Sequence, residues 1–418
     1  MLQQIRLSNF KAFPEHVIDL RAINIWVGAN GSGKSTPIQA LSLMKQSIGH
    51  KQPKLNGDYV RFGSVQEVLN GKSAENELHI GYTAQIEAPL GNLFGFTSPL
   101  VCEYDYTWQQ TKYRGDVVKS WGAIKSQGAE LRSNGLAVVP YELKSRRGVS
   151  HTFGAVALVG QFLQVTSGTN VPGINDSWKE EEQAKALASI SESVLNSLHP
   201  IPSIRGFREP RYTLGSQSSD RIDYEAGMAA TLEYHREALT EISHLMSRIT
   251  GCPIDLAMEE PNQQINIMRQ GTAPRRNIVT EGFGTNQLIP LLYKVVTASK
   301  GDTLAMEEPE IHLHPRAQAA LFEVLTEAAR QKSLQLILIT HSPHLLLAAL
   351  KQVKDKMLAP EKVSIREFSI DLKTGVADSS EISVSANGQL QRDLTNFFEP
   401  YVEEYQSILT ILGTGLGG

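Results

Sequence analysis

The sequence predicts an α/β fold with an N-terminal β-rich lobe and a helical insertion. Two observations carry this prediction. An almost wholly apolar run at residues 23–27, INIWV, leads directly into a glycine-rich loop, and residues 35–47 behind that loop have helical spacing. Residues 274–350 alternate between apolar strand-like runs and helical stretches, which is typical of a parallel sheet covered by helices.

The other elements divide the chain into three parts. Residues 2–7 and 17–20 alternate like strands, and residues 77–164 carry further β-like runs between Gly and Ser, as in an antiparallel sheet. Residues 177–198 and 223–250 are helical in composition and spacing. We therefore expect an N-terminal half with the glycine-rich loop and the β-rich lobe, a helical insertion, and a C-terminal half with the later motifs, at residues 1–170, 171–260 and 261–418.

Composition limits the functional classes. The chain has 418 residues, of which 41% are hydrophobic and 20% are charged, and its formal net charge is −4. These values are typical of a globular protein and exclude a uniformly basic nucleic-acid-binding protein. Local basic groups at residues 144–147, 205–211 and 275–276 remain candidate contacts for DNA or RNA.

The sequence also favours a cytoplasmic protein without a membrane partner. Residues 1–13, MLQQIRLSNFKAF, lack the basic leader and apolar core of a secretion signal. No apolar run reaches the ~18–20 residues that a membrane-spanning helix needs. Cys102 and Cys252 lie in unrelated contexts with no C-x-x-C pattern, which fits a reducing compartment.

Residues 28–35, GANGSGKS, match the phosphate-loop pattern G-x-x-x-x-G-K-S/T at every position. Glycines allow backbone amides to turn inward, and the start of the following helix adds partial positive charge. We expect Lys34 to meet the β- and γ-phosphates of ATP and the Ser35 hydroxyl to bind Mg²⁺. The alternative is a chance glycine-rich turn between a strand and a helix.

Residues 303–308, TLAMEE, place two adjacent carboxylates at the end of an apolar strand. Because neighbouring side chains of a strand point to opposite faces, we expect them to have different roles. We assign Glu307 to the metal and Glu308 to the base that polarises the attacking water. The alternative is a solvated acidic turn, which the phosphate loop elsewhere in the chain makes less favoured.

Residues 334–341 predict a buried strand that ends in His341, at the sheet edge where ligands bind in α/β proteins. We expect His341 to hydrogen-bond to the γ-phosphate; the alternative is a histidine satisfied within the core. His312 and His314 have the spacing of metal ligands, but no further Cys or His cluster supports zinc.

These motifs resemble the ABC-type ATPase heads of the SMC, RecF and OLD group. Residues 7–13, LSNFKAF, followed by the phosphate loop are similar to the start of such a head. Residues 306–315, MEEPEIHLHP, resemble its Walker B motif and D-loop, and residues 339–342, ITHS, its switch histidine. Compact bacterial AAA-type proteins related to OLD are more similar still, over residues 1–68 and 278–348.

The closer resemblance rests on further short motifs. It includes residues 61–68, RFGSVQEV, and residues 282–287, GFGTNQ, with a weaker similarity at residues 205–208, RGFR. The common ABC signature has Ser before two glycines where this chain has Gly-Phe-Gly, and many ABC ATPases have Asp where this chain has Glu307. For the Q-loop glutamine we favour Gln66, with Gln46 as the second candidate. The resemblance implies a P-loop NTPase of the ABC-ATPase-head type.

Carried over residue by residue, the resemblance implies three sets of site residues. The catalytic residues would be Glu308, His341 and Lys34. The nucleotide-binding residues would be Asn30, Gly31, Ser32, Gly33, Lys34, Ser35, Thr36, Lys11, Gly282, Gly284 and Gln287. The magnesium-binding residues would be Ser35, Glu307 and Gln66.

The resemblance also implies a mechanism, in which two heads sandwich two ATP molecules head to tail and hydrolysis releases the dimer. We expect an ATPase that forms a homodimer or higher homo-oligomer and controls a separate effector protein or nucleic acid, in bacterial phage defence or DNA repair. An ATP-binding sensor or scaffold with negligible hydrolysis is the alternative. Asp371 and Asp378 form no D-x-D cluster, so we expect no Toprim nuclease domain in this chain.

Overall fold

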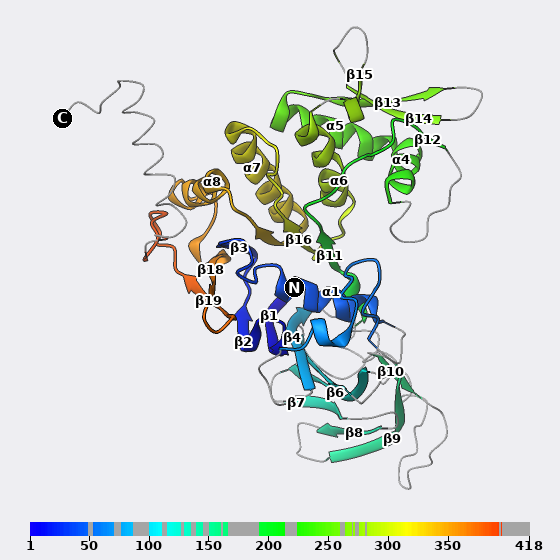
Figure 1. Ribbon diagram of the computed structural model, residues 1–418, viewed down its shortest axis with the longest axis vertical. Coiled ribbons are helices and arrows are strands. Elements are labelled where there is room, and N and C mark those ends of the chain that lie inside the picture. The colour runs from blue at the N-terminus through cyan, green and yellow to red at the C-terminus, as the bar shows by residue number, and fades with distance from the viewer. Residues whose placement is uncertain are drawn as a thin grey trace, which may run out of the picture.

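The computed structural model contains three sheets with helices packed against them (Figure 1). The central sheet carries the predicted motifs, the largest sheet forms the N-terminal lobe, and the smallest lies beside two helices at the opposite end of the molecule. The structure describes residues 1–48, 53–70, 77–86, 100–110, 115–126, 129–134, 139–144, 150–159, 162–165, 192–213, 224–259, 264–269, 271, 276–280, 282–392 and 394.

The N-terminal lobe is a nine-stranded antiparallel sheet in the order β10-β9-β8-β7-β6-β5-β4-β1-β2. From β4 onward each strand pairs with the next strand along the chain. This arrangement confirms the antiparallel sheet predicted for residues 77–164. Its strands are β1 (Leu2–Phe10), β2 (Phe13–Asp19), β4 (Glu77–Ile86), β5 (Leu100–Gln110), β6 (Gly115–Ser126), β7 (Ala129–Asn134), β8 (Val139–Lys144), β9 (Ser150–Val159) and β10 (Phe162–Val165).

The central sheet has six strands in the order β11-β16-β17-β3-β18-β19. The first five are parallel to their neighbours, and only β19 is antiparallel. The carboxyl ends of the parallel strands therefore lie along one edge of the sheet, where ligands bind in such folds. The strands are β3 (Ile23–Gly28), β11 (Leu198–Ile201), β16 (Thr303–Glu307), β17 (Gln335–Ile339), β18 (Val363–Asp371) and β19 (Val376–Ile382).

Strands β3, β16 and β17 in the middle of this sheet are buried on both faces, which explains their continuous apolar runs. Trp26 of β3 packs into a core shared with the N-terminal lobe, whereas its neighbours Ile25 and Val27 pack into a second core. Four helices flank the sheet and follow the phosphate loop or the strands of the C-terminal half: α1 (Thr36–Gln46), α6 (Phe283–Thr297), α7 (Pro315–Lys332) and α8 (Pro343–Lys354). The predicted α/β fold is confirmed.

The far end of the molecule combines two helices with the smallest sheet (Figure 1). Helix α5 buries Leu239, Ile242 and Met246 and packs on α6 and α7. The elements here are α4 (Tyr224–Tyr234), α5 (Arg236–Thr250), β12 (Tyr212–Thr213), β13 (Ile254–Glu259), β14 (Gln264–Arg269) and β15 (Arg276–Asn277). Short 3₁₀ helices elsewhere in the chain are η1 (Val65–Glu67), η2 (Ile278–Thr280) and η3 (Pro360–Lys362).

The helices predicted at 223–250 are confirmed by α4 and α5. The helix predicted at 177–198 is partly wrong: residues 192–196 are helical, but Leu198 begins β11. The strand forms because its apolar ends, Leu198 and Ile201, are buried where β11 pairs in parallel with β16. Most of that predicted helix lies outside the described residues.

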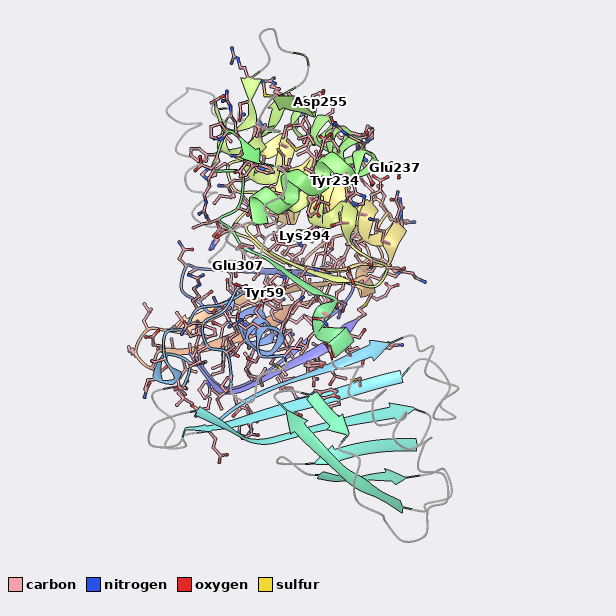
Figure 2. The ribbon with its side chains drawn as sticks, turned by 90° about the vertical axis from the view of Figure 1, so that its right-hand side faces the viewer. Tyr59, Tyr234, Glu237, Asp255, Lys294 and Glu307 are labelled. Carbon is pink, nitrogen blue, oxygen red and sulfur yellow. The ribbon has the colours of Figure 1, made fainter. Side chains whose placement is uncertain are left out.

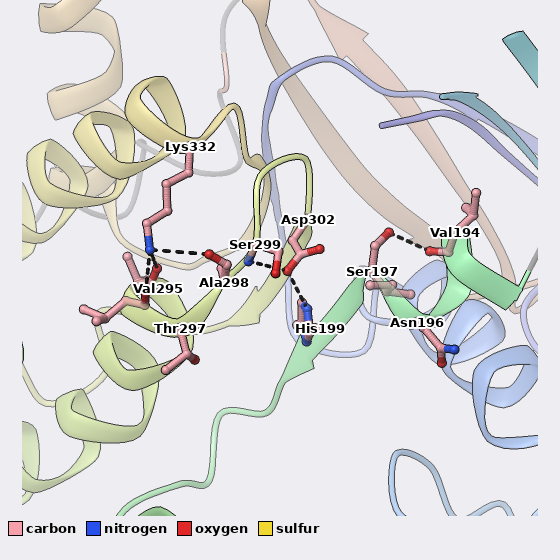
Figure 3. A network of polar contacts seen from close by, with 12 residues as sticks. Val194, Asn196, Ser197, His199, Val295, Thr297, Ala298, Ser299, Asp302 and Lys332 are labelled. Carbon is pink, nitrogen blue, oxygen red and sulfur yellow. Dashed lines mark hydrogen bonds and ion pairs between the residues drawn. The ribbon is translucent and has the colours of Figure 1, made fainter. Parts of the chain in front are cut away.

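Polar contacts hold β11 between α1 and α6. Figure 3 shows His199 of β11 bonded to Asp302 at 3.0 Å, and Asp302 also accepts from the backbone nitrogen of Ser299 just after α6. Lys332 donates to carbonyl oxygens at the end of α6, including that of Val295. Lys45 near the end of α1 donates to the carbonyl oxygens of Asn196, just before β11, and of Leu198, the first residue of β11. The phosphate-loop helix and α6 are thus tied to the same edge strand.

No helix among the described residues combines the length and apolar character needed to cross a membrane.

Candidate nucleotide-binding site

The phosphate loop forms the turn between β3 and α1. Gly28, Gly31 and Gly33 have positive φ angles of 142°, 77° and 92°, which glycine adopts at little cost. Packing adds to this requirement: a β-carbon at Gly28 would lie 2.2 Å from the carbonyl oxygen of Phe368, and one at Gly33 would lie 3.0 Å from the Phe13 ring. The backbone therefore has the conformation that the sequence pattern predicts.

Lys34 folds back across this loop. Its ammonium group donates to the carbonyl oxygens of Gly28 at 2.8 Å and Ala29 at 2.7 Å. Burial lowers the pKa of Lys34 to about 8, and the nearby Glu308 carboxylate opposes that change. The side chain thus places a cation inside the loop, where bound phosphate would compensate for the loss of water.

The other loop residues fit the same ligand. The buried hydroxyl oxygen of Ser32 has no hydrogen-bond partner within the described residues. Buried hydroxyl groups are normally paired, so this one suits a phosphate oxygen held by the loop. Asn30 and Gly31 are exposed at its tip, and Thr36 is buried at the start of α1.

Ser35 and Glu307 meet, as predicted for magnesium ligands. The Ser35 hydroxyl hydrogen-bonds to the carboxylate of Glu307, the last residue of β16. Burial raises the pKa of Glu307; the Ser35 hydrogen bond and Lys11 oppose the rise, and Glu308 adds to it. Hydroxyl and carboxylate oxygens are ligands that Mg²⁺ accepts. Figure 2 shows Glu307 between the helical end of the molecule and the N-terminal sheet.

Lys11 lies at the edge of this pair. It connects β1 to β2 with a positive φ angle of 51°, and its ammonium group donates to the side chain of Gln39 in α1 at 2.7 Å. Burial lowers the pKa of Lys11, while Glu307 and Glu67 oppose that change. The structure thus brings Lys11 into the electrostatic field of the predicted metal ligand.

Glu308 lies within electrostatic range of Lys34 and His341. Burial lowers the pKa of His341, Lys34 lowers it further, and Glu308 opposes both. Glu308 has a positive φ angle of 45°, and its backbone nitrogen donates to the carbonyl oxygen of Ile339 at 2.8 Å. We expected Glu307 and Glu308 to have different roles because neighbouring side chains of a strand point to opposite faces. That reason was wrong, because β16 ends at Glu307 and Glu308 lies outside the strand.

Glu310 is a buried carboxylate that the sequence analysis missed. One of its oxygens accepts from the Thr340 hydroxyl and, at 3.3 Å, from the backbone nitrogen of His341. The other has no hydrogen-bond partner within the described residues, and burial raises the pKa of Glu310. In the sequence, the only feature that could have pointed to Glu310 was its place in the motif EEPE, residues 307–310. Glu310 links the turn after β16 to the backbone of His341.

The two Q-loop candidates have different surroundings. Gln46 is buried, and its amide bonds to backbone groups of residues 54–60 on both sides. Gln66 lies in η1 and is exposed. The side chain of Gln46 is therefore used in folding, which leaves Gln66 as the candidate for magnesium.

The predicted signature, residues 282–287, begins α6, with Gly282 as the residue before the helix. A β-carbon on Gly284 would lie 2.4 Å from the carbonyl oxygen of His312, so this turn packs on the predicted D-loop of the same chain. The side-chain oxygen of Gln287 is buried and has no partner in the described part of the chain. Phe283 is 72% exposed.

The two histidines of the H-x-H pair are used differently. Nδ1 of His314 accepts from the backbone nitrogen of Arg316 and caps α7. The ring of His312 lies 5.8 Å from that of Phe283. No three His, Cys, Asp or Glu side chains gather as metal ligands in the ranges that the structure describes.

Comparison with known proteins assigns the family. A family profile described as "AAA ATPase domain" matches residues 1–87 and 175–346, more than half of the chain. The chain belongs to this AAA ATPase domain family. Over 92 residues it is 26% identical to the DNA replication and repair protein RecF of Renibacterium salmoninarum. That match covers 22% of this chain and only 23% of the RecF protein.

Solved SMC heads are also similar to this chain. The SmcHead bound to the C-winged helix domain of ScpA has 12% identity and a TM-score of 0.49, over 91% of this chain and 98% of that one. The SMC head domain from Thermotoga maritima has 12% identity and a TM-score of 0.44, over 92% of this chain and 99% of that one. The family and the RecF relative confirm the predicted resemblance to the SMC, RecF and OLD group, and with the parallel sheet they confirm the ABC-type P-loop fold class.

Proposed function

We propose that this protein binds ATP with Mg²⁺ and hydrolyses it. One observation carries the proposal: Lys34, Glu308 and His341 interact at the ends of three adjacent parallel strands, β3, β16 and β17. A phosphate-binding cation and a carboxylate that can orient water are groups that phosphoryl transfer uses, and the histidine lies at the same sheet edge.

In the proposed reaction, Lys34 holds the β- and γ-phosphates, and Glu308 accepts a proton from the attacking water. The water oxygen bonds to the γ-phosphorus, and the bond to the leaving ADP oxygen breaks. His341 would hydrogen-bond to the γ-phosphate. Mg²⁺, held by Ser35 and Glu307 with Gln66 as a further ligand, would neutralise charge on the phosphate oxygens.

We also propose that two copies enclose two ATP molecules, each copy presenting residues 282–287 to the nucleotide of the other. In such a dimer the exposed Phe283 at the start of α6 would be covered. The cycle would control a separate effector protein or nucleic acid, in DNA repair or phage defence. The partial similarity to RecF supports the first of these processes.

The test is ATP turnover as a function of protein concentration, with two variants. Lys34→Ala should abolish nucleotide binding. Glu308→Gln should bind ATP, stop turnover and accumulate as a dimer in saturating ATP-Mg²⁺, seen by light scattering. A monomeric Glu308→Gln protein under these conditions would overturn the sandwich. Tight ATP binding with no turnover above this variant would instead support a nucleotide sensor.

A further inference from the structure

Arg205 lies in the segment between β11 and α4, inside the basic group of residues 205–211. Its guanidinium does not face outward as a nucleic-acid contact would. It donates instead to six backbone carbonyl oxygens, at 2.9 to 3.4 Å, those of Pro202, Ser203, Gln287, Glu307, Glu308 and Pro309. All three guanidinium nitrogens are engaged.

These bonds hold the residue proposed as the base. Glu308 has a positive φ angle of 45°, a conformation that non-glycine residues rarely adopt and that persists only where the surroundings enforce it. Its backbone nitrogen donates to Ile339, while its carbonyl oxygen accepts from Arg205 at 3.1 Å. Arg205 also donates to the carbonyl oxygen of Glu307 at 3.0 Å, so hydrogen bonds hold both peptide groups beside the Glu308 α-carbon.

The same short segment also holds α6. Nε of Arg205 donates to the carbonyl oxygen of Gln287 at 3.1 Å. Two residues later, the backbone nitrogen and oxygen of Phe207 exchange hydrogen bonds of 2.8 Å with the buried side chain of Asn286. Gly206 between them has a φ angle of 117°, which other residues rarely adopt. Residues 205–207 thus join the turn after β16 to the first turns of α6.

We propose that Arg205 is a positioning residue, which orients Glu308 for reaction and ties that orientation to the docking of α6. The guanidinium group is suited to this role because its planar fork of five donors can reach several carbonyl oxygens at once. A lysine would keep the charge but could not reproduce the fork. The inference rests on the proposed ATPase function.

The experiment compares Arg205→Lys with Arg248→Lys. Arg248 is an exposed arginine of α5 that pairs with Glu327 at the surface, so its replacement should change little. ATP affinity should stay within ~threefold of wild type in both, since Lys34 and its loop are untouched. Turnover should fall ~10- to 100-fold in Arg205→Lys alone, and added guanidinium ion should restore part of the turnover of Arg205→Ala.

Hydrogen exchange supplies a second readout that does not depend on turnover. Amide exchange should rise in Arg205→Lys at residues 307–311 and 283–288 together, and remain unchanged in Arg248→Lys. Unchanged exchange at both segments, or Arg205→Lys turnover above half of wild type, would overturn the inference. Wild-type protein that binds ATP without hydrolysing it would contradict the proposed function instead, and the exchange data would still decide whether Arg205 joins the two segments.

Discussion

Gly284 lies directly against the backbone of His312: a β-carbon at position 284 would stand 2.4 Å from the His312 carbonyl oxygen. No side-chain rotation can relieve such a contact, because both partners are backbone. The first turn of α6 and the turn after β16 therefore fit together only while residue 284 is glycine. This relationship places the predicted signature in contact with the segment that carries Glu308 and Glu310.

Gly284→Ala should consequently shift α6 away from the D-loop. We expect ATP turnover to fall at least ~10-fold, since a misplacement of about 1 Å caused by a mutation away from the reacting groups can cost ~100-fold, while ATP binding to the phosphate loop persists. Steady-state turnover and nucleotide titration measure the two effects. Thr297→Ala, at an exposed position at the other end of α6, should lose much less activity; equal losses would show that packing on His312 is not the cause.

The two glutamine candidates can be separated by substitution. Gln46→Ala would remove the side-chain hydrogen bonds to backbone groups of residues 54–60, and we expect it to lower the free energy of unfolding by ~2–4 kcal/mol. Gln66→Ala, at an exposed position, should change stability by less than ~0.5 kcal/mol.

If Gln66 binds Mg²⁺, the Gln66→Ala variant should need several-fold more Mg²⁺ for half-maximal turnover. Denaturant unfolding measures the stability of both variants, and ATP turnover at increasing Mg²⁺ concentration measures the magnesium requirement of Gln66→Ala. A Gln66→Ala protein with an unchanged magnesium requirement would remove Gln66 from the site.

Lys45 gives a pH dependence of stability. Burial lowers its pKa from 10.5 to about 8; Lys294 lowers it further, and Asp302 opposes the change. Between these two pH values the unfolded chain holds the proton and the folded protein releases it. In this pH range the unfolded state binds more protons than the folded state, so the free energy of unfolding rises with pH. Below this range Lys45 is protonated in both states and adds no pH dependence.

Lys45→Met has no such titration. We expect the free energy of unfolding of wild type, relative to Lys45→Met, to increase by ~1–3 kcal/mol from about pH 7.5 to about pH 10. Urea unfolding at several pH values measures the difference. If the two proteins differ in free energy of unfolding by the same amount at every pH in this range, burial does not lower the pKa of Lys45.

The parts of the site that could be predicted from the sequence are those encoded locally. The glycines of residues 28–35 and the apolar strands before Gly28 and Glu307 lie within short stretches, so spacing and hydrophobic pattern were sufficient. The meeting of Lys34, Glu308 and His341 followed from the rule that parallel strands end at one edge.

The missed features depend on contacts between distant segments. The guanidinium of Arg205 bonds to Gln287 and to the turn at 307–309, and in the sequence it belongs to an ordinary basic cluster. The positive φ angle of Glu308 is likewise invisible in a strand-like pattern, because neighbouring tertiary contacts impose it. Gln46 could not be separated from Gln66 without knowing which of them is buried.

With Arg205 turned inward, the candidate contact for nucleic acid becomes a smaller basic surface, formed by Arg208, Arg211, Arg269 and Arg276. Arg269 and Arg276 are paired across β14 and β15. The side chain of Asn277 donates to the carbonyl oxygen of Pro210 at 2.8 Å, which brings the two segments together. Arg208, Arg211 and Arg276 are exposed.

If this surface binds DNA or RNA phosphates, the double variant Arg211→Glu/Arg276→Glu should lower affinity at least ~10-fold and reduce the slope of log affinity against log salt by about 2, because each lost phosphate contact contributes ~0.9. Fluorescence anisotropy with single- and double-stranded oligonucleotides over a salt series measures both quantities. The double variant Arg330→Glu/Lys351→Glu reverses the same number of exposed charges on α7 and α8 and should leave the slope unchanged. Equal losses in the two double variants would mean that net charge, rather than this surface, determines binding.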